Sequence, residues 1–170
     1  MKHLALTLSL LIVSLSLAAE SIDKRLRTHS TPGGTLYFIA DKKLSKHDKG
    51  IDKFLYDITY VDSRDSATIN FSILSASPAD VATLTIGNAT ARIEAEGVAL
   101  LYHELHKKKY LIRTTAKVPY AALKPILTSS QPLSFTIGRT DGQTHTAFYS
   151  PGQWKSEQAL FGRIVYLINK

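Results

Sequence analysis

The chain has no cysteine among its 170 residues. It therefore has no disulfide bond, no thiol nucleophile, no cysteine-based zinc site and no cysteine to carry a lipid anchor. Secreted eukaryotic domains of this size usually contain disulfides. If the chain is exported, the lack of cysteine favours a bacterial protein that is periplasmic or secreted and is not a lipoprotein.

Long apolar runs are missing too, except for one at the N-terminus. Leu4 to Leu17 is apolar apart from Thr and Ser, follows the positive Lys2, and leads into Ser16-Leu17-Ala18, a small-x-small pattern. The run is too short to span a bilayer comfortably, and it ends in a cleavage signal. We interpret residues 1–18 as a signal peptide cut after Ala18, which leaves no transmembrane segment in the mature chain.

Recognisable catalytic motifs are also absent. The sequence has no G-x-S-x-G elbow, no glycine-lysine phosphate loop, and no Ser-x-x-Lys accompanied by its partner motifs. No helix-turn-helix or RNP-like strand points to nucleic acid. We therefore assign no catalytic residue, no cofactor and no metal ligand from the sequence, and we expect a binding protein more readily than an enzyme.

One stretch has the residue types of an active site. In "YHELHKKKY", residues 102–110, Glu104 lies between His103 and His106, which resembles part of a zinc-protease motif. The histidines are three residues apart rather than four, and "VALL" before them and "YLIRTTAKV" after the lysines alternate as strands do. Residues three apart in a strand point to opposite faces. The spacing therefore predicts a hairpin tip in preference to a metal site.

Positive charge is the remaining functional signal. The formal net charge is +7, or +6 without the leader, whose single charged residue at neutral pH is Lys2. The strongest candidate is an anion-binding patch at the hairpin tip, made of His106, Lys107, Lys108 and Lys109. Further clusters would add to this patch if the fold gathered them on one side: Lys24, Arg25 and Arg27, and Lys42, Lys43, Lys46 and Lys49. Otherwise each run is a solvated loop.

Alternation of apolar and polar residues dominates the rest of the chain. Phe54, Tyr56, Ile58 and Tyr60 fall on one face of a strand, with Asp57 and Thr59 on the other. Similar patterns and turn signals predict a set of short strands: 35–40, 54–61, 67–74, 81–86, 90–96, 98–105, 110–118, 132–139 and 144–149. Residues 41–50, "DKKLSKHDKG", are expected to form a charged loop.

Two segments change to helical spacing. A short helix is expected near 120–128, where Pro125 lies inside, and a capping helix near 153–168, where Trp154, Phe161, Ile164 and Ile168 recur on one side. The sequence thus predicts a mainly β fold: an antiparallel β-sandwich or curled sheet of about 8–9 strands with these two helices. Residues 19–34 are expected to be a polar tether, and 35–170 a single β-rich domain.

Three functions are compatible with this sequence. The first is an exported, non-enzymatic binding or envelope-accessory module whose partner is a protein or an envelope polymer, with an anionic ligand as one possibility. The second is a secreted hydrolase with a site near His103, Glu104 and His106. The third is a small outer-membrane β-barrel, for which the helical C-terminus is a poor match.

Overall fold

The structure is a computed structural model that describes residues 22–44 and 46–170. The expected signal peptide, residues 1–18, lies outside the described residues. Residues 22–25 form one helical turn, and residues 26–31 of the segment expected to be a tether form the first strand. No helix within the described ranges is both long enough and apolar enough to cross a membrane.

The first sheet has six antiparallel strands in the order β1-β2-β4-β5-β9-β8. Their bounds are β1 Leu26–Thr31, β2 Gly34–Leu44, β4 Ile51–Val61, β5 Ser66–Ser75, β9 Lys109–Pro119 and β8 Glu96–His106. β4 with β5 and β8 with β9 form the two hairpins that the sequence predicts. β5 also pairs with β9 over nearly its full length, which the sequence did not predict.

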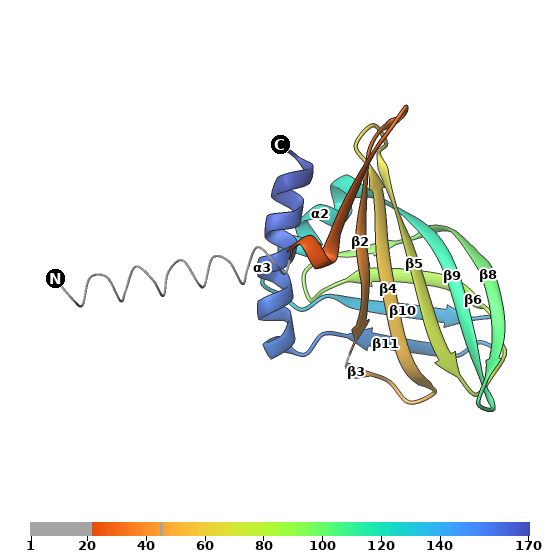
Figure 1. Ribbon diagram of the computed structural model, residues 1–170. Coiled ribbons are helices and arrows are strands. Elements are labelled where there is room, and N and C mark those ends of the chain that lie inside the picture. The colour runs from red at the N-terminus through yellow and green to blue at the C-terminus, as the bar shows by residue number, and fades with distance from the viewer. Residues whose placement is uncertain (1–21, 45) are drawn as a thin grey trace, which may run out of the picture.

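The second sheet has five antiparallel strands in the order β3-β11-β10-β6-β7. Their bounds are β3 Lys46–His47, β11 Thr144–Phe148, β10 Ser134–Arg139, β6 Val81–Gly87 and β7 Arg92–Glu94. Its strands cross those of the first sheet steeply (Figure 1), which is the orthogonal way of stacking two sheets. The predicted mainly β, antiparallel fold is confirmed.

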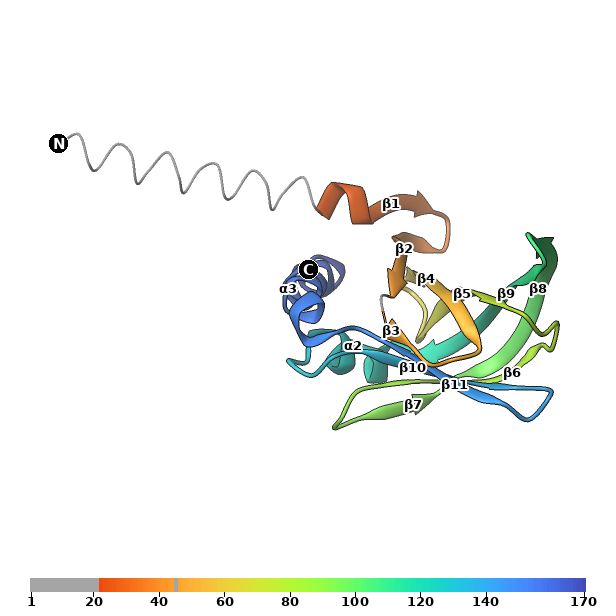
Figure 2. The ribbon, with the colours of Figure 1, turned by 90° about the horizontal axis from the view of Figure 1, so that it is seen from below.

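The chain changes sheets at two corners. One residue separates β2 from β3, and Ala95 alone separates β7 from β8. The Ala95 N–H still donates to the Leu84 carbonyl of β6 at 2.8 Å, after which β8 leaves β6 and pairs with β9. Such corners allow one strand to contribute to both layers. Figure 2 shows the two layers from below.

The core lies between the sheets and contains the side chains that the alternation marked as apolar. Phe54, Tyr56 and Ile58 are at most 2% exposed. Phe135 of β10 packs on the rings of Phe54 and Tyr56 at centroid separations of 5.1 and 4.6 Å. Because aromatic side chains bury large apolar areas, this contact between the layers is a main source of stability.

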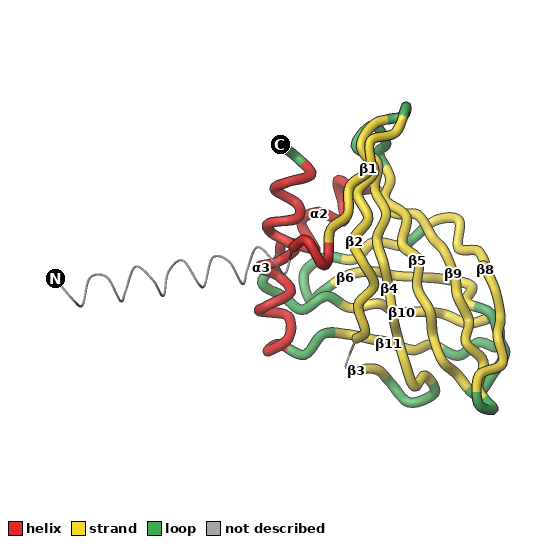
Figure 3. Tube along the Cα trace, in the orientation of Figure 1, coloured by secondary structure: helices red, strands yellow, loops and turns green. Residues whose placement is uncertain are grey.

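Both predicted helices are present: α2 is Tyr120–Thr128 and α3 is Pro151–Ile168. α3 lies across one open end of the two sheets (Figure 3), where Trp154, Phe161 and Ile164 are buried. The Trp154 indole N–H donates to the Ser129 carbonyl just after α2, at 2.9 Å. The expected capping role of the C-terminal helix is therefore confirmed.

The sequence expectation differs from the structure in three details. The described residues form eleven strands rather than 8–9, because β1 lies in the expected tether and β3 in the expected charged loop. Residues 41–44 and 46–47 of the expected charged loop are strand residues. Asp57, expected on the wet face, is 2% exposed, because the Arg113 guanidinium from β9 pairs with its carboxylate and the Asn70 amide donates to it at 2.8 Å.

Candidate functional site

The expected anion-binding residues lie at the tip of the β8–β9 hairpin. His106 pairs with Lys109, and Lys107 and Lys108 form the two-residue loop between them. Both loop lysines have positive φ, 48° and 67°, which is the conformation of a type I′ turn. Every other positive-φ position among the described residues is a glycine. The chain therefore holds two lysines where asparagine and glycine would be less strained.

Neighbouring charges reduce this patch. Lys109 Nζ is 2.8 Å from Asp52 Oδ2. Arg25 and Lys42, from the other two clusters, both reach the carboxylate of Glu157 on α3, at 3.5 and 2.6 Å. These two cations are therefore bound to the helix-capped end of the molecule, and His106, Lys107 and Lys108 remain at the hairpin tip.

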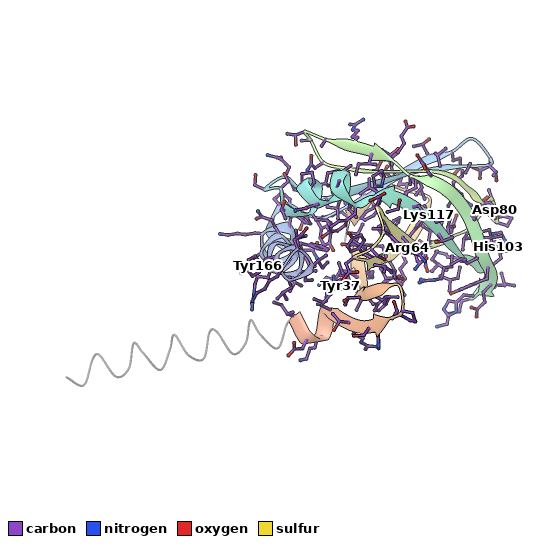
Figure 4. All side chains as sticks on the ribbon, turned by 90° about the horizontal axis from the view of Figure 1, so that it is seen from above. Tyr37, Arg64, Asp80, His103, Lys117 and Tyr166 are labelled. Carbon is purple, nitrogen blue, oxygen red and sulfur yellow. The ribbon has the colours of Figure 1, made fainter. Side chains whose placement is uncertain are left out.

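The three residues His103, Glu104 and His106 do not converge. His103 pairs with Ile112, Glu104 with Leu111 and His106 with Lys109 along the ladder. Strand alternation places His103 on one face of the sheet and the other two residues on the opposite face. His103 Nε2 instead lies 2.7 Å from Asp80 Oδ1, just before β6 (Figure 4). Within the described residues no group of three or more histidine, aspartate or glutamate side chains is arranged to hold a metal ion.

A pronounced hollow lies elsewhere, between the β4–β5 turn, the start of α2 and the end of α3. It has a volume of about 770 Å³, within the usual range for small-molecule sites. We call it the tyrosine hollow, because Tyr60 and Tyr120 stack in its wall with ring centroids 3.9 Å apart. Its lining combines apolar and charged residues: Tyr60, Asp62, Arg64, Asp65, Pro119, Tyr120, Ala121, Lys124, Pro125, Thr128 and Asn169.

Hydrogen bonds fix the helical side of the tyrosine hollow. The Asn169 amide donates to the Tyr120 hydroxyl at 3.3 Å, and Lys124 Nζ donates to the Asn169 side-chain oxygen at 3.2 Å. This chain of contacts joins the start and the middle of α2 to Asn169, the residue just after α3. It holds an ammonium group and a phenol beside the same opening.

The turn side of the tyrosine hollow is acidic as well as basic. Asp62 accepts the Thr35 N–H at 3.0 Å, so its carboxylate is anchored to β2. Burial raises the pKa of the Tyr60 hydroxyl, and the negative charges of Asp62 and Asp65 raise it further. Burial also raises the pKa of Tyr120, against the lowering effect of the Asn169 hydrogen bond. Both phenols therefore stay protonated at neutral pH and remain able to donate hydrogen bonds.

A second, more polar hollow of about 510 Å³ adjoins the first. Arg64 and Asp65 line both, and the second continues along the outer face of the six-stranded sheet to Lys117. Figure 4 shows Arg64 and Lys117 near each other. The β4–β5 turn is thus a rim between two hollows, with Arg64 accessible from both.

The lining groups are suited to recognition. Asp, Arg, Lys and Asn side chains provide hydrogen bonds of both polarities, and the tyrosine and proline rings provide apolar contact. The Thr128 hydroxyl already donates to the Lys124 carbonyl at 3.1 Å, and the lining contains no histidine, serine or cysteine. These residues do not include a nucleophile paired with a general base.

No family model, curated protein or solved structure matches this chain, so its geometry is the basis for a functional assignment.

Sequence reasoning did not identify the residues of the tyrosine hollow. Tyr60 was assigned to a buried face, and Tyr120, Lys124 and Asn169 showed no recognisable motif. The three elements meet because α2 and α3 pack against each other at the end of the sheets. A spacing rule could not find a site whose parts are separated by 60 residues between Tyr60 and Tyr120.

Proposed function

We propose that this chain is an exported, non-enzymatic binding module whose ligand site is the tyrosine hollow. The observation that carries the proposal is the combination of a stacked tyrosine pair with convergent polar groups in one opening of about 770 Å³. Hollows of this kind, mostly apolar with a few placed polar groups, are the common form of small-molecule sites.

The lining indicates the kind of ligand. Pro119, Pro125 and the tyrosine rings favour a flat or aliphatic part, and Lys124 and Arg64 favour an anionic or strongly accepting group. Asp62 and Asp65 balance those cations, so hydrogen bonding contributes more to selectivity than net charge does. A ring-bearing molecule with a carboxylate and a hydroxyl group would satisfy each part of the lining.

The experiment fills the hollow without removing core contacts. Ala121 is exposed and lines the hollow, and Ala122 is exposed on the same helix and does not line it. A panel of ring-bearing carboxylic acids is screened against the protein by NMR, with resonances of Tyr60, Tyr120 and Lys124 followed. We expect Ala121→Trp to abolish the shifts and the matched control Ala122→Trp to preserve them. The proposal is contradicted if an acid binds equally well to the Ala121→Trp and Ala122→Trp variants. It is also contradicted if no acid of the panel binds at the tyrosine hollow.

The hairpin tip supports a second candidate, contact with an anionic polymer. The observation that favours it is the positive φ of Lys107 and Lys108, since strained backbone is retained more readily where the side chains have a role. Retention on immobilised heparin tests it. Lys107→Glu with Lys108→Glu and Lys109→Glu should reduce retention more than Lys155→Glu with Arg163→Glu and Lys170→Glu. Both triple variants change the net charge equally, so equal losses would contradict a tip-specific site.

A further inference from the structure

Strand β8 forms an open edge of the six-stranded sheet. It pairs with β9 along one side, and the sheet order places no strand of the described residues on its other side. β8 is 11 residues long, and all of them except Val98 are exposed. Its free backbone N–H and C=O groups are therefore available to another strand.

Apolar side chains are concentrated on this edge. Leu100 is 44% exposed, Leu101 52%, Tyr102 43% and Leu105 67%. These are four of the seven large hydrophobic residues that are exposed in the described part of the chain. A long, apolar edge strand promotes association between chains unless it is covered.

The other three edges of the two sheets differ from β8. β3 has two residues and β7 has three, which limits pairing with another chain. β1, "LRTHST", has one apolar residue in six. Short length and polar side chains are common protections of sheet edges. β8 has neither protection along its centre, so its composition requires a different explanation.

Charge along β8 is arranged asymmetrically. Glu94 and Glu96 precede the apolar centre, and His106, Lys107 and Lys108 follow it. Two copies of this segment placed antiparallel bring the acidic start of each opposite the basic end of the other. The segment is therefore complementary to itself in charge as well as in apolar character.

We propose that β8 pairs antiparallel with β8 of a second copy of this chain, around a two-fold axis at Tyr102. This is strand addition at a sheet edge, in an interface that uses the same surface of both copies. It joins two six-stranded sheets into one and covers the exposed leucines. The proposal is independent of any ligand in the tyrosine hollow.

The existing ladder supports this register. Leu100 pairs with Thr114 and Tyr102 with the adjacent Arg113, so Leu101 is the extra residue of a bulge. With Leu101 left out of the count on both strands, Leu100 lies opposite His103 of the second copy. Moving outward by two residues, Val98 lies opposite Leu105 of the second copy.

Side-chain direction agrees with that pairing. Tyr110, the ladder partner of Leu105, and Val98 both pack against the core, so Val98 and Leu105 point to the same side of the sheet. Cross-strand partners must share a face in this way. A second bulge lies between Glu96 and Ala99, so the same register places Glu96 at the His106–Lys107 end of the second copy and gives two acid–base contacts in each dimer.

Analytical ultracentrifugation over a range of protein concentrations tests association. We expect the wild-type chain to sediment as a dimer, and Leu101→Lys to weaken the dimer by about 100-fold in dissociation constant. The matched control is Leu167→Lys, because Leu167 is also an exposed leucine, 42% exposed, and lies on α3. α3 and β8 are at opposite ends of the molecule (Figures 1 and 2). Circular dichroism confirms that both variants are folded.

A charge exchange tests the register. Glu96→Lys alone and Lys107→Glu alone should each weaken the dimer roughly tenfold, because each brings like charges close together across the interface. The double variant restores the attraction and should regain wild-type association. Amide exchange in β8 should also slow as the dimer forms.

Three results would overturn the proposal. These are a wild-type chain that stays monomeric at every concentration, a dimer weakened equally by Leu101→Lys and Leu167→Lys, and a dimer whose β8 amides exchange as fast as in the monomer. A double charge variant that associates no better than either single variant would overturn the register.

Discussion

Two buried tyrosines connect the sheets at the level of single residues. The hydroxyls of Tyr56 on β4 and Tyr149, just after β11, are 2.7 Å apart, and their rings meet edge to face. Both side chains are at most 1% exposed. A polar contact in such a place matters chiefly because either hydroxyl left alone would be buried without a partner.

Replacing one tyrosine of this pair by phenylalanine should therefore lower the free energy of unfolding more than replacing both. We expect Tyr149→Phe to lower the free energy of unfolding by about 1–3 kcal/mol, because Tyr56 loses its hydrogen-bond partner. Tyr56→Phe with Tyr149→Phe should be close to wild type, because both polar groups are removed. Urea unfolding measures all three proteins. A double variant no more stable than Tyr149→Phe would contradict this account.

Alkaline pH should lower the stability of the folded chain through the same two tyrosines. Burial raises the pKa of Tyr56 and of Tyr149 above the ordinary value of 10.0. Below that value both hydroxyls are protonated in the folded and the unfolded chain, so stability does not depend on them. Above it the unfolded chain loses their protons first. Stability should then fall by roughly 1.4 kcal/mol per pH unit for each tyrosine.

Urea unfolding across the alkaline range measures this dependence. The variant with Tyr56→Phe and Tyr149→Phe is its control, since its stability should fall less steeply with pH. An unchanged slope in that variant would assign the alkaline loss to other groups.

At the scale of elements, the β8–β9 turn has a conformation that its residues disfavour. Lys107 and Lys108 occupy the two positive-φ positions of a type I′ turn, where asparagine and glycine are the usual residues. Left-handed backbone costs an L-residue roughly 1–2 kcal/mol, and glycine avoids that cost. The lysines are therefore kept at a cost to stability.

Lys107→Asn with Lys108→Gly should raise the free energy of unfolding by about 1 kcal/mol. Lys107→Gln with Lys108→Gln removes the same charges and keeps the backbone strain, so it should change stability little. Denaturant unfolding compares the two variants. If the glutamine pair stabilises as much as the Asn-Gly pair, repulsion between the lysines, rather than backbone strain, explains the effect.

The same elements show what local pattern could predict. The β4–β5 and β8–β9 hairpins and both helices followed from alternation, turn residues and helical spacing, because each depends on residues close in sequence. The burial of Asp57 did not follow, since it depends on Arg113 and Asn70 from two neighbouring strands. His103 and His106 were assigned to opposite faces by strand geometry alone, in agreement with the ladder.

At the scale of the whole molecule, the tyrosine hollow and the β8 edge are well separated. The tyrosine hollow lies by α2 and the end of α3, and β8 lies at the other end of the sheets (Figure 1). Sites that are distant and share no partner usually contribute independently. One end of the molecule is thus available to a small ligand and the other to a second copy.

Independence of the two surfaces is directly testable. We expect Leu101→Lys to leave the affinity of a ring-bearing acid for the tyrosine hollow within about twofold of wild type, and Ala121→Trp to leave the dimer constant equally unchanged. NMR titration and sedimentation provide the two measurements. A loss of ligand binding in folded, monomeric Leu101→Lys would show that the surfaces are coupled.

The sequence by itself determined nine of the strands, the two main helices, most core residues and the absence of thiol chemistry. These depend on side-chain period and composition, which are local properties. Only the tertiary structure decided that Tyr60 and Tyr120 share a hollow, that Arg25 and Lys42 meet on Glu157, and that β8 is an open edge. The reason is physical: strand order and helix docking bring distant residues together through packing of the whole core, and no short window of sequence contains that information.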